Sequence, residues 1–126
     1  MKNLFTLFAL VFCFALSAVN TASAQHEIKN GTNCDFEVKI GYALSGSCSA
    51  TGFMSVFVPA NTNVTVTLPA GNEIYIAKGR YAATMSCPFY IGISCTPYPT
   101  TVGVSCSTAC GDYTAVLNPA LGIKLY

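Results

Sequence analysis

Six cysteines between residues 34 and 110 limit how this chain can fold more than any other feature. An even number of cysteines in a small exported chain predicts a disulfide framework, here of up to three bonds, each contributing ~2–4 kcal/mol by restricting the unfolded chain. Short-range closure favours Cys34 with Cys48, Cys87 with Cys95, and Cys106 with Cys110. Neighbouring strands can bring other pairs together, so the sequence leaves the connectivity open.

The N-terminal segment has the pattern of a cleavable signal peptide. Lys2 precedes an apolar run from Leu4 to Leu16, which includes the seventh cysteine, Cys13, and small residues follow as far as Ala24. The run is shorter than the ~20 apolar residues that a membrane-spanning helix needs. We therefore predict a signal peptide of bacterial type over residues 1–24, cleaved near Ala24-Gln25. Residues 25–126 are then one secreted, periplasmic or cell-surface domain with no integral membrane segment.

Alternation of apolar and polar residues predicts strands in most of this domain. The pattern is strict from Asp35 to Tyr42 and again from Asn63 to Leu68, and Ile74 and Ile76 are assigned to the buried face of a strand that Gly79 ends. Turn residues recur at the spacing of a sandwich or small barrel. The expected fold is an all-β, small antiparallel β-sandwich or small barrel of about seven to nine short strands. The strands are predicted at residues 35–42, 53–58, 63–68, 73–78, 89–94, 101–105, 113–117 and 122–126.

The charge balance gives no sign of a polyanionic partner. Of six basic residues, Lys2 lies in the predicted signal peptide, so five remain against five acidic residues. A neutral domain with scattered basic groups lacks the electrostatic footprint of a nucleic-acid-binding protein. We expect no nucleic acid among the partners.

Metal and cofactor motifs are missing from the sequence. The cysteines include no Cys-x2-Cys, so we expect disulfides and neither a metal site nor a cofactor. The single histidine, His26, lies near the predicted mature terminus and is expected to be solvated. Cleavage after Gln25 would create a terminal amine and imidazole that chelate copper, as in copper monooxygenases, but those enzymes need a second histidine.

Catalytic groups are sparse. A serine nucleophile needs a rigidly held histidine beside it, which a mobile terminus does not provide. Asp35 and Glu37 share a strand face with Lys39 and are interpreted as a solvated outer row. Glu73 and Asp112 are left as the carboxylate pair that a secreted hydrolase would use.

The best candidate for ligand binding is the segment from Arg80 to Pro99. It contains three tyrosines together with two cysteines and three prolines, and Tyr98 lies between two of the prolines, which hold its backbone extended. Tyrosine offers a flat apolar face and a hydroxyl at low entropic cost, which suits sugar or protein recognition. The candidate contact residues are Tyr98, Tyr90, Tyr81 and Arg80. Core packing of these rings is the competing interpretation, and the sequence does not decide between exposed and buried.

Residues 28–38, with Asn33 and Cys34 ahead of a strand, resemble the first strands of thaumatin-like proteins. Those proteins have more cysteines and an acidic cleft that this chain does not match. The resemblance therefore implies no site residue.

These observations favour a non-enzymatic exported binding module with a glycan or protein ligand. One alternative is a small secreted hydrolase that uses a carboxylate pair. Another is a structural envelope or matrix protein, or an inhibitor.

Overall fold

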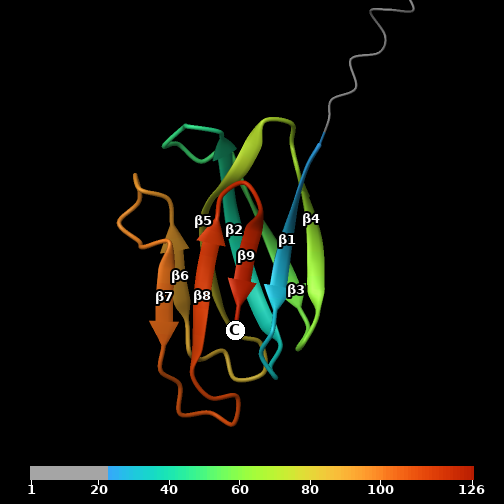
Figure 1. Ribbon diagram of the computed structural model, residues 1–126, viewed down its shortest axis with the longest axis vertical. Helices are drawn as coiled ribbons and strands as arrows, with labels where there is room; N and C mark the ends of the chain where they lie inside the picture. The colour runs from blue at the N-terminus through green and yellow to red at the C-terminus, as the bar shows by residue number, and fades with distance from the viewer. Residues whose placement is uncertain (1–22) are drawn as a thin grey trace, which may run out of the picture.

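Alternating side chains build β-strands throughout residues 23–126, the part of the chain that the computed structural model describes. The strands form a five-stranded sheet in the order β4-β1-β9-β8-β7 and a four-stranded sheet in the order β3-β2-β5-β6, packed as a sandwich (Figure 1). The predicted small sandwich is confirmed, and a barrel is not formed. The nine strands of the described residues are β1 Ala24–Asn30, β2 Phe36–Leu44, β3 Gly52–Val58, β4 Asn63–Leu68, β5 Asn72–Tyr81, β6 Phe89–Gly92, β7 Thr101–Val104, β8 Tyr113–Asn118 and β9 Gly122–Leu125.

The predicted signal peptide falls almost wholly outside the described residues and stays a prediction. Within residues 23–126, no helix is long and apolar enough to cross a membrane.

Eight of the nine strands lie where the alternation predicts them, but β1 was missed. The inward positions of β1 are His26, Ile28 and Asn30, two of which are polar, so the apolar alternation is hidden. β1 pairs with β4 in antiparallel fashion and with β9 in parallel (Figure 1). One parallel pair therefore interrupts the antiparallel arrangement that was expected.

The expectation that His26 is solvated near a mobile terminus is wrong. His26 lies opposite Val66 in the β1–β4 ladder and is 3% exposed. Pairing on both sides holds β1 firmly, so its inward side chains are enclosed whether or not they are apolar.

Two expectations about β5 are also corrected. Gly79 does not end this strand, which continues to Tyr81. A Cβ at Gly79 would overlap the ring of Phe89, so glycine is needed for close packing and not for a turn. Ile76 faces outward because the register with β2 shifts: Gly41 pairs with Ile76 but Tyr42 pairs with Ile74.

Between the sheets, four aromatic rings form the centre of the core. The ring of Phe36 lies 4.8 Å from Tyr81, 4.9 Å from Tyr113 and 6.2 Å from Phe89, measured between centroids. The Tyr81 hydroxyl donates to the carbonyl of Gly111, and that of Tyr113 donates to the carbonyl of Cys87. The buried hydroxyls are satisfied and at the same time hold two loops against the core.

Three disulfides join loops at the ends of the sandwich, and their connectivity differs from short-range closure. The bonds are Cys34–Cys110, Cys48–Cys95 and Cys87–Cys106. Each bond joins two different loops, with sequence separations of 76, 47 and 19 residues, so distance along the chain is a poor guide to pairing. Such a small, disulfide-rich β protein is typical of an oxidising, extracellular environment.

Replacing Phe36 with alanine should lower the free energy of unfolding by about 3–5 kcal/mol, because the cavity removes contacts with three other rings. Urea unfolding of the oxidised protein measures this. Phe57→Ala is the matched control, since Phe57 is 56% exposed and should shift the value by less than about 0.5 kcal/mol. Equal losses in the two variants would contradict this account of the core.

Alkaline titration should separate Tyr113 from the exposed tyrosines. Burial first, and then the neighbouring Tyr81, raises the pKa of Tyr113 well above its ordinary value of 10.0. Burial first, and then the Asp112 carboxylate, also raises the pKa of Tyr81. The folded protein therefore keeps protons that the unfolded chain loses, so stability is full below pH 10 and falls as the pH rises above it. Absorbance at 295 nm should show a component that ionises well above pH 10, and this component should shrink in Tyr113→Phe.

Candidate functional site

The outer face of the four-stranded sheet carries a group of exposed aromatic and basic side chains that alternation places outside the core. Cross-strand register arranges them in rows. The middle row runs Ser55, Lys39, Lys78 and Tyr90 across β3, β2, β5 and β6. At ~4.8 Å between strands, this row spans roughly 14 Å.

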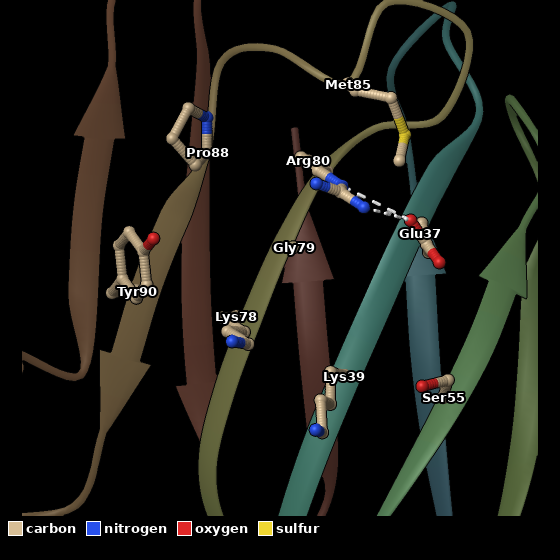
Figure 2. Close-up of a pocket in the computed structure, with 9 residues that line it drawn as sticks. All are labelled: Glu37, Lys39, Ser55, Lys78, Gly79, Arg80, Met85, Pro88 and Tyr90. Atoms are coloured by element: carbon tan, nitrogen blue, oxygen red, sulfur yellow. Dashed lines mark hydrogen bonds and ion pairs between the residues drawn. The ribbon is translucent and has the colours of Figure 1, made fainter.

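Lys39 and Lys78 lie directly opposite each other in the middle row (Figure 2). Both are exposed, and among the described residues neither has a carboxylate oxygen within 4.0 Å. The Lys39 ammonium instead lies 5.4 Å from the centroid of the Phe53 ring. Like charges directly opposite each other destabilise a sheet, so this pair has a cost that the fold itself does not require.

Arg80, predicted as a contact residue, is held by an acidic neighbour in the next row. Its Nη2 lies 3.0 Å and its Nε 3.2 Å from Glu37 Oε2 (Figure 2). Both side chains are about half exposed, so the pair contributes at most about 1 kcal/mol to stability. Its effect is to neutralise this row and leave the two lysines as the uncompensated charge of the face.

Two adjoining hollows indent the face and share Lys39, Lys78 and Tyr90 as lining residues. The floor of the smaller hollow contains Gly41, where a Cβ would lie 2.8 Å from both Ile76 and Phe53. Glycine therefore lets these two side chains close over β2. The larger hollow, of about 400 Å³, is also lined by Glu37, Ser55, Gly79, Arg80, Met85 and Pro88 (Figure 2). The smaller, of about 220 Å³, also includes Phe53, Gly41, Ile76 and Tyr98.

The rings of Tyr90 and Tyr98 stack at the β6 side of the smaller hollow. Their centroids are 5.5 Å apart with an interplanar angle of 25°, and the side chains are 44% and 36% exposed. Both predicted contact residues are therefore on the surface. Tyr81 is not: it is 2% exposed and belongs to the core.

The loop after β6 fixes the position of Tyr98. The Gly92 amide donates to the Pro99 carbonyl, and the Thr96 hydroxyl donates to the Ile93 carbonyl and accepts from the Tyr98 amide. The Cys48–Cys95 disulfide ties the same loop to the β2–β3 connection. Tyr98 is thus held at the rim by hydrogen bonds within its own loop and by one disulfide to a second loop.

Of the charged residues predicted on the outer face, Glu37 and Lys39 line the hollows, whereas Asp35 is exposed and lines neither of them. Glu73 and Asp112 do not join this site. Glu73 lies eight residues before Tyr81 on β5, a rise of ~26 Å, whereas Asp112 lies beside Tyr81. Carboxyl groups that cooperate in glycoside hydrolysis lie about 5–10 Å apart, so these two do not form such a pair.

His26 lines a separate hollow together with Asn72 and Glu73. The two ring nitrogens of His26 and Oδ1 of Asn72 have no hydrogen-bond partner in the described structure. In residues 23–126, no group of three or more histidine, cysteine, aspartate or glutamate side chains is placed to hold a metal ion.

Sequence reasoning missed Lys39 and Lys78 as a pair, and Phe53 with them. Alternation places each on an outer face, but only the β2–β5 register brings the lysines together. No carboxylate lies directly opposite either lysine on the neighbouring strands, and this becomes visible only once the register is known.

Comparison with known proteins does not add a relative. A scan against protein-family models finds no match, and searches of curated proteins and of solved structures likewise return none.

Gly92→Ala should separate the Tyr90 and Tyr98 rings. A Cβ at Gly92 would overlap Thr96 Oγ1 and lie 2.9 Å from Thr96 Cβ, so the loop that carries Tyr98 must move. Nuclear Overhauser contacts between the two rings should weaken or vanish. Gly103→Ala on β7 is the control, because a Cβ there meets nothing within 4 Å, and it should leave the contacts unchanged. Persistence of the contacts in Gly92→Ala would show that Thr96 does not position Tyr98.

Proposed function

We propose that this protein is a non-enzymatic, extracellular binding module that holds a glycan on the outer face of its four-stranded sheet. The observation that carries the proposal is the stacked, exposed Tyr90–Tyr98 pair at the rim of a hollow. Exposed tyrosine rings give the apolar face of a sugar ring a flat surface to lie on, and their hydroxyls add hydrogen bonds. The rings are already ordered, so little entropy is lost on binding.

The composition of the face favours a glycan over a protein ligand. Lysine is depleted from the cores of protein–protein interfaces, yet two lysines occupy the middle of this face. Both hollows are bordered by the charged side chains of Lys39 and Lys78, which suits a hydroxyl-rich ligand. The rigid scaffold, with disulfides anchoring the surrounding loops, supports a preformed site.

A structural role is the second candidate, and β3 is the observation that favours it. This strand is an edge of the four-stranded sheet, and Gly52–Val58 contains neither charge nor proline. Phe53 and Phe57 are more than half exposed on its outer side. An uncharged edge of this kind can pair with another strand, as in an assembling envelope or matrix protein.

Alanine replacements of Tyr90 and Tyr98 test the glycan proposal. The oxidised wild-type protein should bind saccharides on a glycan array. Each replacement should raise the dissociation constant roughly tenfold, because about 1.4 kcal/mol of stacking is lost. Isothermal titration with the best array saccharide gives the constants.

Tyr126→Ala is the matched control. Tyr126 is 57% exposed, but its ring lies against Lys124 of the other sheet. The Tyr126→Ala variant should bind the saccharide with the affinity of the wild type. Failure of the wild type to bind any saccharide, or unchanged affinity after loss of both rings, would overturn the proposal. Monomeric behaviour at high concentration would count against the assembly role.

A further inference from the structure

Lys39 and Lys78 have no carboxylate partner among residues 23–126, and this bears on which glycan the outer face would select. We infer that Lys39 and Lys78 form an anion subsite, so that the ligand is an acidic glycan whose carboxylate or sulfate group lies between them. This inference rests on the proposed function and adds the charge of the ligand to it.

The geometry allows one anion to contact both ammonium groups. Lys39 and Lys78 are direct cross-strand partners, so their backbones are only ~4.5–5.5 Å apart and their side chains rise from the same face. Ser55 pairs with Lys39 on the other side and offers a hydroxyl donor. A carboxylate or sulfate accepts several such hydrogen bonds at once.

The neighbouring rings place a sugar beside this anion. Tyr90 is the direct partner of Lys78, and the ring stacks with that of Tyr98. Phe53 lies across the smaller hollow, against Lys39. A sugar ring can therefore lie on the tyrosine pair while its acidic substituent reaches the lysines. An anion bound there also removes the repulsion between the two ammonium groups, so binding and relief of strain act in the same direction.

The lysines of the five-stranded sheet, when compared with Lys39 and Lys78, support assigning the anion subsite to the four-stranded sheet. Lys29 and Lys124 are also cross-strand partners, in the five-stranded sheet, but Lys29 has an ion pair with Glu27 at 3.1 Å. On the outer face of the four-stranded sheet, the one carboxylate among the hollow-lining residues is that of Glu37, and Arg80 occupies it. The near-neutral sequence thus conceals one face with two uncompensated positive charges.

Binding to three polymers tests the inference: polygalacturonate carries carboxylates, dextran sulfate carries sulfates, and dextran is uncharged. The wild type should bind one or both acidic polymers at least tenfold more tightly than dextran, and the affinity should fall as salt is raised. The polymer that binds identifies the anion. The double variant Lys39→Gln/Lys78→Gln should lose at least tenfold in affinity for it and should be no less stable than the wild type to urea.

Lys29→Gln/Lys124→Gln is the matched control, because it removes the same charge from the other sheet. It should stay within twofold of the wild type. An equal loss in both double variants would mean general attraction to a polyanion and would overturn the subsite. A different result would overturn the inference while supporting the proposed function: the wild type binds dextran as tightly as the acidic polymers, Tyr98→Ala loses this binding, and Lys39→Gln/Lys78→Gln keeps it. Binding to none of the polymers, and to no other saccharide, would overturn both.

Discussion

The contact of Phe36 with Tyr81 and Tyr113 joins the two sheets, and the rest of the molecule depends on it. Phe36 and Tyr81 come from the four-stranded sheet and Tyr113 from the five-stranded one. Because Phe36 and Tyr81 face inward, the residues that alternate with them along β2 and β5 must face outward. A slip of one residue would carry Lys39 and Lys78 into the core, where unpaired charge is very costly. The core thereby fixes the outer face, although no core residue belongs to it.

Alternation made most of the fold predictable, and the exceptions have physical causes. β2 and β4 were evident because every inward position is apolar. β1 was not, because His26 and Asn30 are buried polar residues. The side-chain amide of Asn30 donates to the carbonyls of Val58 and Pro59, which belong to a distant segment that no local pattern around Asn30 contains. Gly79 was predicted to end its strand. Glycine is instead required there by the ring of Phe89, which lies on the neighbouring strand and leaves no room for a Cβ.

The candidate site was predictable in part. Tyr98 and Tyr90 were proposed as contacts because prolines and aromatic residues cluster within a short stretch of chain, and both are exposed. Tyr81, from the same stretch, faces the core, since the direction of a ring depends on register and not on composition. The net charge near zero also hid the lysine pair. A sum over the sequence treats all charges alike, whereas the sheet places Glu37 beside Arg80 and leaves Lys39 beside Lys78.

The parallel pairing of β1 with β9 has a consequence for how the chain reaches its folded state. Residues 27 and 122 are partners in the interior of the five-stranded sheet. Until β9 has been synthesised, β1 is paired only with β4 and β8 only with β7, and two-stranded units of this kind are barely stable in water. Contacts this distant in sequence also form slowly. The five-stranded sheet is therefore expected to close late in folding, because two of its inner strands come from residues 24–30 and 122–125 and must meet before the outer pairs are joined.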